Sequence, residues 1–408
     1  MRSTRLASTL LSAAILAPRA FAAAQPLPPS VAAVASNNTA FACDLYAQLK
    51  TQDGNLFFSP YSVSTALAMT YAGARGETAA QMAKALHFSL PQAELHPAFA
   101  ALAAQMNAVQ TAGHVKLSIA NSLWPYKTYP FLEDYLALVK KNYGSTITPV
   151  DYEHAEPAAR AQINQWVEDK TQKKITNIIG APLDPLTRLV LVNAVYFKGT
   201  WESPFKAEET KNAPFHRPVG DPVQTPLMTH TRTYKYGEWQ TVQVIELPYA
   251  GNELSMLVLL PSSTNGMAEL EGDLSVSGLQ QWRQQLRLQK VQLFLPKFKI
   301  TWGAALLNNA LQALGMSDAF NATRADFSGM DGRPDLLISR ILQKAFVDVN
   351  EEGTEAAAAT AITMHSLAIS RPRPPPVFRA DHPFLFLIQE NATGSILFMG
   401  RVTDPMAQ

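Results

Sequence analysis

Apolar residues recur at helical spacing along much of the chain. Between residues 157 and 174, for example, Ile163, Trp166 and Val167 follow the i, i+3, i+4 spacing of one helix face. Ser59 followed by Pro60 is a typical helix start, because serine caps the first turn and proline fits it. These patterns predict helices over residues 34–50, 60–74, 78–88, 91–110, 130–142, 157–174, 267–286 and 304–314.

Extended patterns dominate the second half of the chain. Residues 115–124 alternate apolar and polar side chains, whereas residues 187–198 are almost continuously apolar, as in a strand buried on both faces. Because helices come mostly early and strands mostly late, with no linker between them, we predict one α+β domain. The predicted strands span residues 55–58, 115–124, 146–150, 187–198, 290–301, 336–349, 383–390 and 395–403, with a β-rich region from 214 to 261.

One segment, residues 350–383, is long, poor in side chains that pack, and placed between two strongly apolar stretches. Loops of this kind in a compact domain are usually functional. Its alanine-rich part favours a helix by propensity alone, but it also alternates between a small face and a face with Glu355 and His365. A strand with small inward residues can slide between existing strands, so this segment suits two states, an exposed loop and an inserted strand. The inward face would hold Thr354, Ala356, Ala358, Thr360, Ile362 and Met364.

Composition and charge narrow the function. The chain has 408 residues, of which 47% are hydrophobic, enough for a large core. Residues 1–22 have the basic start, apolar middle and Ala-x-Ala-like site of a signal peptide, with cleavage after residue 22 or 24. Its removal changes the formal net charge from +1 to −2, which argues against a nucleic-acid partner. The apolar run is too short for a membrane anchor, so we expect a secreted or periplasmic protein with no membrane partner.

The sequence lacks the motifs of common enzyme classes. It contains no His-Glu-x-x-His, no Gly-x-Ser-x-Gly and no phosphate-binding loop, and its eight histidines are scattered. The single cysteine, Cys43, lies in an apolar helical pattern, which predicts a packed core thiol and excludes an internal disulfide. We therefore expect no enzyme activity, no cofactor and no metal.

Seven segments, taken in order, resemble the serpin family. They are NLFFSPYSVSTALAM (55–69), INQWVEDKTQKKI (163–175), LVNAVYFKGTWESPF (191–205), LPKFKI (295–300), VNEEGTEAAAAT (349–360), ADHPFLFLI (380–388) and ILFMGRV (396–402). The resemblance covers residues 38–404, a single domain with a reactive-centre loop at residues 351–380. It implies three β-sheets and eight or nine helices, with the loop exposed.

The resemblance also implies a mechanism. A target serine protease attacks the loop as a substrate and forms an acyl bond to it, and the loop then inserts into the central sheet and distorts the protease before deacylation. The partner would be held in a covalent acyl complex, and the uncleaved monomer would be trapped kinetically in a less stable form. An alanine-rich hinge is similar to that of inhibitory members.

Three groups of residues are carried over from the family by their positions in these motifs. The hinge that inserts would comprise Glu351, Glu352, Gly353, Thr354, Glu355, Ala356, Ala357, Ala358, Ala359 and Thr360. The opening of the sheet, called the breach, would contain Trp201, Lys297 and Glu351. The polar cluster beneath its centre, called the shutter, would contain Ser59, Ser62, Asn193 and Gln343. Many members have histidine at the last of these positions, so the hydrogen bonds there must differ.

The family's spacing, counted from Glu351, predicts a reactive bond between Leu367 and Ala368. A leucine there suits chymotrypsin-like, subtilisin-like or elastase-like serine proteases, or papain-like cysteine proteases, and argues against trypsin-like ones. The alternative bonds are Met364–His365 and Ser366–Leu367.

The loop is longer than in many serpins, which leaves a second way of counting. Counting back from Pro383 points to Arg371–Pro372, but cleavage before proline is chemically poor. The extra length is predicted to be the tract from Pro372 to Pro376, after the cut, where it would stiffen the return strand.

Two other functions stay open on the sequence. A non-inhibitory serpin would bind a ligand or chaperone a partner, although the hinge favours inhibition. A glycosaminoglycan-activated inhibitor would need a basic helix surface, and residues 98–110 contain no lysine or arginine.

Overall fold

The structure, a computed structural model, describes residues 27–111, 113, 115–145, 147–354 and 374–407. The predicted leader lies outside these residues. The helices are α1 (Pro29–Leu49), α2 (Pro60–Tyr71), α3 (Gly76–Ala85), α4 (Gln92–Thr111), α5 (Glu133–Tyr143), α6 (Glu156–Lys170), α7 (Met267–Asp273), α8 (Val276–Gln285), α9 (Asn308–Ala313) and α10 (Ser328–Asp331), with single 3-10 turns η1 (Ala207–Glu209) and η2 (Asp318–Phe320). The strands are β1 (Leu56–Phe58), β2 (Val115–Pro125), β3 (Leu189–Thr200), β4 (Lys211–Phe215), β5 (Val223–Trp239), β6 (Val242–Pro248), β7 (Leu254–Pro261), β8 (Arg287–Pro296), β9 (Phe298–Leu306), β10 (Arg340–Asn350), β11 (Gly353–Thr354), β12 (Val377–Arg379), β13 (Phe384–Glu390) and β14 (Ile396–Val402).

Two helix predictions differ from the structure. The single helix predicted over residues 267–286 is divided into α7 and α8, because Ser275 leaves the helical conformation and caps α8: its Oγ accepts a hydrogen bond from the Gly278 N–H at 3.0 Å. The helix predicted over residues 304–314 begins only at Asn308, because the residues before it extend β9. With the single-turn α10, these differences bring the described residues to ten α-helices.

Two strand predictions also differ. The strand predicted over residues 290–301 is interrupted at Lys297, where the chain passes from one sheet to the other and the backbone N–H donates to the Pro226 carbonyl at 2.9 Å. Residues 147–150 form only isolated bridges to the end of β2, so the strand predicted over 146–150 is not present in the described part of that segment.

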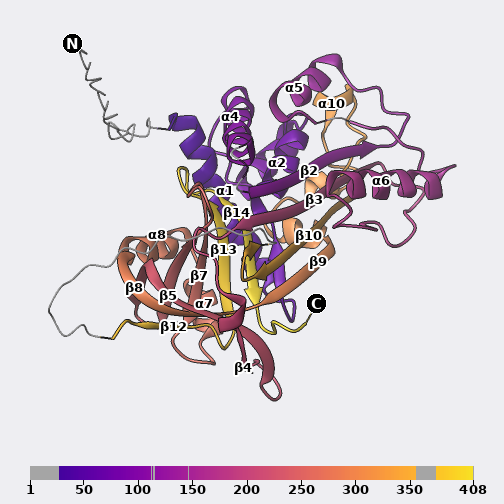
Figure 1. Cartoon of the computed structure of the whole chain (residues 1–408). Coiled ribbons are helices and arrows are strands. Elements are labelled where there is room, and N and C mark those ends of the chain that lie inside the picture. The colour runs from indigo at the N-terminus through magenta and orange to yellow at the C-terminus, as the bar shows by residue number, and fades with distance from the viewer. Residues whose placement is uncertain (1–26, 112, 114, 146, 355–373, 408) are drawn as a thin grey trace, which may run out of the picture.

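The strands form two hydrogen-bonded networks, whose strands are labelled in Figure 1. The first has the order β1-β14-β13-β7-β6-β5-β8-β12, with β4 beside β5, and the second has the order β2-β3-β11-β10-β9. β5 has 17 residues; its first part pairs with β4 and β8, and its end pairs with β6. This strand joins two of the three expected sheets into one network, and the α+β architecture is as predicted.

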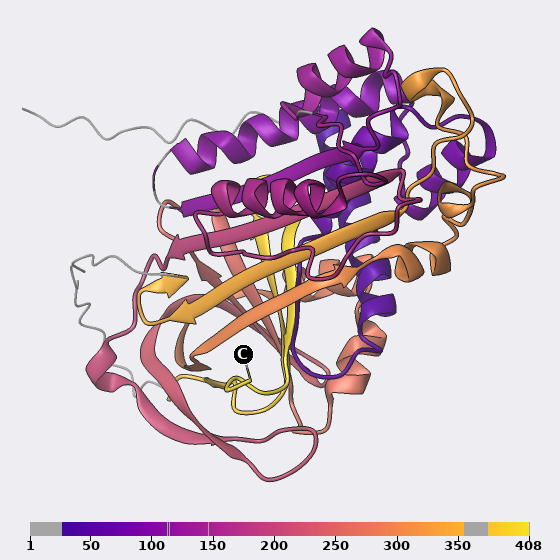
Figure 2. The same ribbon diagram turned by 90° about the vertical axis from the view of Figure 1, so that its right-hand side faces the viewer.

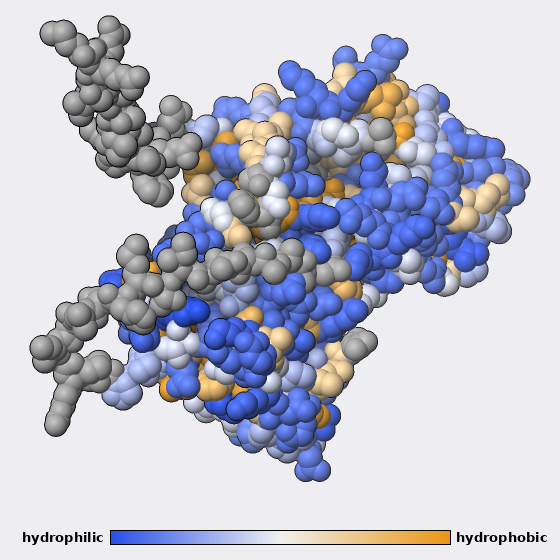
Figure 3. Space-filling view, viewed as in Figure 1, coloured by the Kyte–Doolittle hydropathy of each residue, from blue (hydrophilic) through white to orange (hydrophobic). Residues whose placement is uncertain are grey.

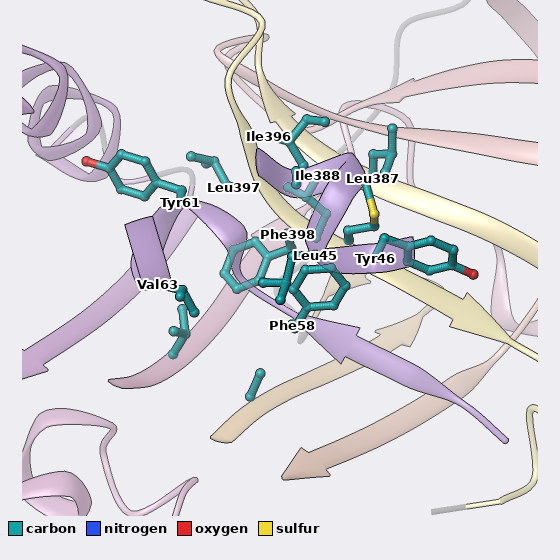
Figure 4. Close-up of a cluster of buried hydrophobic side chains, with 14 of the residues drawn as sticks. Leu45, Tyr46, Phe58, Tyr61, Val63, Leu387, Ile388, Ile396, Leu397 and Phe398 are labelled. Atoms are coloured by element: carbon teal, nitrogen blue, oxygen red, sulfur yellow. The ribbon is translucent and has the colours of Figure 1, made fainter. Parts of the chain in front are cut away.

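Helix α2 fills the space between the two networks. Ser59 caps it as predicted, accepting a hydrogen bond from the Ser62 N–H at 3.2 Å, and almost every residue of the helix is buried. Figure 4 shows how side chains of α1, β1 and α2 meet those of β13 and β14, with Phe58 and Phe398 near the centre. The polar groups at the start of α2 are therefore held against the inner face of the five-stranded sheet.

The outer face of the five-stranded sheet is covered by α6, as Figure 2 shows. Ile163 and Val167, two residues of the predicted helical stripe, are fully buried there against Trp124 and Val190 of the sheet. In the part of the chain that the structure describes, no helix combines the length and apolar character needed to cross a bilayer.

Candidate functional site

The five-stranded sheet is open at the end where the predicted loop leaves it. β3 and β10 run parallel and pair directly over seven residues each. Beyond that point they separate, and β11 lies between them, antiparallel to both. Gly353 pairs with Thr200 of β3 and with Asn350 of β10. The chain therefore turns back from β10 and enters the sheet with the first residues of the predicted hinge.

Glycine is required at this point of entry. Gly353 has φ of 147°, and a Cβ there would lie 2.1 Å from the carbonyl oxygen of Gly199 and 2.7 Å from the Cα of Thr200. Gly199 is equally confined, since a Cβ on it would lie 2.7 Å from the ring of Tyr249. Backbone therefore packs directly on backbone where β11 starts.

Trp201 and the backbone after it hold the turn between β10 and β11. The indole Nε1 of Trp201 donates to the Asn350 carbonyl at 3.0 Å, and its backbone N–H donates to the Glu352 carbonyl at 3.0 Å. The Phe205 N–H donates to the Glu351 carbonyl at 2.8 Å. Three successive carbonyl groups of the turn are thus satisfied by one short stretch of chain.

The Glu351 side chain is held by two partners. Its Oε2 lies 2.8 Å from Lys297 Nζ, and its Oε1 accepts from the Thr210 hydroxyl at 2.9 Å. Burial alone would raise the pKa of Glu351, but the hydrogen bonds from Lys297 and Thr210 outweigh it and leave the pKa below its usual value. The structure thus brings the three predicted breach residues together. Thr210, the second partner, carried no signal in the sequence.

The four predicted shutter residues form one buried hydrogen-bonded group. Gln343 Oε1 accepts from the Ser59 N–H at 3.2 Å, while its Nε2 donates to the Ser59 carbonyl at 3.0 Å and to Asn193 Oδ1 at 2.6 Å. Asn193 Nδ2 donates in turn to the Ser62 hydroxyl. Gln343 therefore ties β10 to β3 and both strands to the start of α2, in the position where the resemblance led us to expect a different network.

Asn121 of β2 is a fifth member that sequence reasoning missed. It pairs with Asn193 in the β2–β3 register, its Oδ1 accepts from Asn193 Nδ2, and the Ser62 hydroxyl donates to the same oxygen at 3.1 Å. The only signal for it was a polar residue at an inward position of an alternating strand.

Several predicted site residues lie outside the described residues. They are the rest of the hinge (Glu355, Ala356, Ala357, Ala358, Ala359 and Thr360), the reactive bond (Leu367 and Ala368) and its alternatives (Met364, His365 and Ser366). Among the residues that are described, no group of three or more His, Cys, Asp or Glu side chains is placed to hold a metal ion.

The comparisons with known proteins agree with this geometry. The family model described as "Serpin (serine protease inhibitor)" matches residues 36–405. The chain belongs to the serpin family. It is 43% identical over 384 residues to human leukocyte elastase inhibitor, which covers 91% of this chain and 99% of that protein. A serpin-like protein of Thermococcus kodakarensis is 40% identical over 365 residues, or 90% of this chain and 84% of that one.

Solved structures share the fold. Serpin48 of the insect Tenebrio molitor superposes with a TM-score of 0.80 at 34% identity, covering 91% of this chain and 98% of that one. Uncleaved ovalbumin gives a TM-score of 0.80 at 30% identity, covering 91% and 100%. The serpin assignment made from seven sequence segments is confirmed.

Proposed function

We propose that this serpin inhibits a serine protease as its suicide substrate, with the hinge inserting as a strand between β3 and β10. One observation carries the proposal: β11 is antiparallel to both strands and lies at the end where they separate. Insertion has only to continue a pairing that β11 has begun.

The register of β11 specifies where each later residue would pair. Continuing it brings residues 355–363 opposite β3 from Lys198 down to Val190, and opposite β10 from Asp348 down to Arg340. That span uses almost the whole length of both strands. The existing sheet is therefore long enough to accept the hinge as a full strand, with the direct β3–β10 pairs exchanged for pairs to the new one.

Alternation decides which hinge side chains would enter the core. Thr354 pairs with Val349, which is buried in the main core, so every second residue from Thr354 onward would face the same way. Ala356 and Ala358 would then face the core, where their small size avoids a clash and their lack of polar atoms avoids an unpaired buried group.

Thr360 would arrive at the shutter. The continued register places it opposite both Asn193 and Gln343, whose side chains now bond each other at 2.6 Å. Insertion would break that bond, and the threonine hydroxyl could donate to Asn193 Oδ1 in its place, while Gln343 Nε2 would keep its bond to the Ser59 carbonyl. No buried amide would be left without a partner, which keeps the cost of opening the sheet small.

The reaction that insertion interrupts is acyl transfer. The protease serine attacks the Leu367 carbonyl carbon, the Leu367–Ala368 bond breaks, and a serine ester forms as the new amino terminus leaves. Insertion would then carry the ester-linked protease along the sheet and distort its oxyanion hole, so that water does not complete hydrolysis. Leu367 and the relatives named as leukocyte elastase inhibitors favour elastase-like or chymotrypsin-like targets, with papain-like enzymes as a second class.

Denaturing gels test the proposal. The protein is incubated separately with leukocyte elastase, α-chymotrypsin, subtilisin and papain, and a covalent complex with at least one serine protease is expected. Thr354→Arg would put a charge at an inward position and should yield cleaved chain without complex, while the matched Thr354→Ser variant should still inhibit. If the wild type yields only cleaved chain, and cleavage does not raise its thermal stability, the protein is a non-inhibitory binding or chaperone serpin instead.

We also propose that the chain is exported and acts as a monomer. The leader features of residues 1–22 support export. On the face shown in Figure 3, hydrophilic residues cover most of the surface and apolar residues form small, separate groups, as in a protein without a permanent partner. Amino-terminal sequencing of the exported protein should start at residue 23 or 25, and size-exclusion chromatography should give the mass of one chain; an intact leader or a dimer would refute these points.

A further inference from the structure

His230 of β5 is a buried histidine beside the stretch of chain that holds the turn between β10 and β11. Its ring stacks on the ring of Phe205, with the ring centres 4.1 Å apart and the planes 14° apart. Phe205 is the residue whose backbone N–H donates to the Glu351 carbonyl, at the start of the predicted hinge. A movement of the imidazole therefore reaches the turn through one residue, Phe205.

The surroundings of the His230 ring suit the neutral imidazole. Its Nε2 lies 2.5 Å from the Tyr234 hydroxyl. Its Nδ1 is buried and has no hydrogen-bond partner of good geometry among the described residues, although the Pro204 carbonyl lies near the ring. Both nitrogens of an imidazolium are donors, so protonation would leave a buried, charged N–H without a partner.

The groups that face His230 from the elements around it differ in sign. Arg232, on the same strand, opposes a positive charge on the ring, whereas the Pro204 carbonyl and Glu209 of η1 favour one. On β8, the neighbouring strand, the residue paired with His230 is the apolar Leu293. Burial, together with the charge of Arg232, outweighs the favourable groups and lowers the pKa of His230 to about 4.

A positive charge on this ring would find no water in the closed arrangement. The space lined by Trp201, Phe205 and Tyr234 is too small to hold a water molecule, and two of these residues contact the His230 ring. A protonated His230 therefore gains hydration when Phe205 moves away from it. That movement strains the hydrogen bond from the Phe205 N–H to the Glu351 carbonyl.

We propose that His230 is an acid-sensitive switch: proton uptake by its ring moves the stretch from Trp201 to Phe205 and releases the turn that precedes the hinge. The neutral ring stabilises the closed sheet, and the protonated, hydrated ring stabilises the open one. The switch sets the pH at which the hinge is free to enter between β3 and β10, and in this it rests on the proposed insertion.

The pH range of the switch follows from the two protonation equilibria. The open form binds a proton that the closed form does not, so opening becomes easier as the pH falls from 6.5, the ordinary pKa of histidine, towards about 4. Between pH 7.5 and pH 5 the opening constant should rise about thirtyfold if the ring becomes fully hydrated, and about tenfold if it is hydrated in part. The pKa of Glu351 is lowered, so its ion pair with Lys297 persists over this range.

Amide hydrogen exchange of the full, uncleaved chain measures the opening at two hydrogen bonds. These are the bond from the Phe205 N–H to the Glu351 carbonyl and the bond from the Trp201 N–H to the Glu352 carbonyl. After correction for intrinsic exchange rates, the protection factors of these two amides should fall about ten- to thirtyfold from pH 7.5 to pH 5.

Two variants and a control assign the fall to one side chain. His230→Gln, which does not titrate, should remove most of the fall, and His230→Phe should do the same if the first variant does not fold. His154→Gln is the matched control, because the His154 side chain is 68% exposed, and it should leave the fall as in wild type. Constant protection in the wild type, or a fall that persists in the His230 variants, would overturn the switch.

A second measurement connects the opening to insertion. The rate at which the uncleaved chain passes into the inserted form, followed as a gain in resistance to urea after return to pH 7.5, should be about tenfold higher at pH 5 in the wild type and nearly constant in His230→Gln. Opening without this gain would overturn the release of the hinge. Absence of a covalent complex with any protease would overturn the proposed function and leave the exchange result standing.

Discussion

The most informative single substitution is Gln343→Leu, which removes the polar link between β3, β10 and α2. Leucine keeps most of the side-chain volume but leaves three groups without their present partner: the Ser59 N–H, the Ser59 carbonyl and Asn193 Oδ1. Both residues that carry these groups, Ser59 and Asn193, are buried, so water cannot replace the lost bonds. At about 1 kcal/mol for each net hydrogen bond, the uncleaved protein should lose about 3 kcal/mol of stability.

The inserted state should suffer less from the same change. Insertion would already have replaced the Gln343–Asn193 bond, so only the two bonds to Ser59 remain to be lost, about 2 kcal/mol. The difference of about 1 kcal/mol should also lower the barrier to opening the sheet, because one bond that must break is missing, and insertion should proceed about fivefold faster.

Urea unfolding of the uncleaved and the loop-cleaved protein measures both losses, with Gln280→Leu on the exposed face of α8 as the control for a surface change of the same kind. The variant should lower the unfolding midpoint of the uncleaved form more than that of the cleaved form. Equal losses in the two forms would mean that the Gln343–Asn193 bond survives insertion, and the register argument for Thr360 would be wrong.

Three further predictions follow from other parts of the structure. Burial lowers the pKa of His96 to about 4, and burial together with the charge of Arg232 lowers the pKa of His230 to about 4. Each histidine therefore makes its full contribution to stability above pH 6.5, and the free energy of unfolding should fall by about 3 kcal/mol for each as the pH falls towards 4. Urea unfolding against pH should show this loss, and His230→Phe should remove part of it. Lys297→Met should cost about 1 kcal/mol at pH 7, and its difference from wild type should disappear below the lowered folded-state pKa of Glu351, since a protonated carboxyl no longer attracts Lys297; a difference that persists in acid would contradict this. Mass spectrometry after reaction with chymotrypsin should find a released peptide of residues 368–408, and a peptide starting at 365 or 367 would move the reactive bond to one of its alternatives.

Local sequence patterns correctly predicted those elements of the fold that depend only on residues adjacent in the chain. The cap of α2 followed from Ser59 and Pro60, and the burial of β3 followed from its nearly continuous apolar run. The break between α7 and α8 was missed, because a serine inside an apolar helical pattern does not reveal that it will act as a cap. The passage between sheets at Lys297 was missed because it depends on the distant Pro226.

In the candidate site, too, features set by nearby residues could be predicted and features set by distant residues could not. Resemblance to known serpins carried over Glu351 and Gln343, and the structure shows what they bind. Thr210 and Asn121 became visible only from the register and the packing, because each acquires its role from a residue far away in the chain. Sequence periodicity did suggest which hinge residues face inward, and the pairing of Thr354 with Val349 gives that suggestion a definite register.

Amide hydrogen exchange of the loop-cleaved protein tests the central claim most directly. If the hinge becomes a strand between β3 and β10, the amides of residues 355–363 should exchange as slowly as those of the neighbouring core strands, while residues beyond 364 exchange faster. Fast exchange throughout residues 355–363, with the direct β3–β10 pairs still protected, would show that the hinge does not insert.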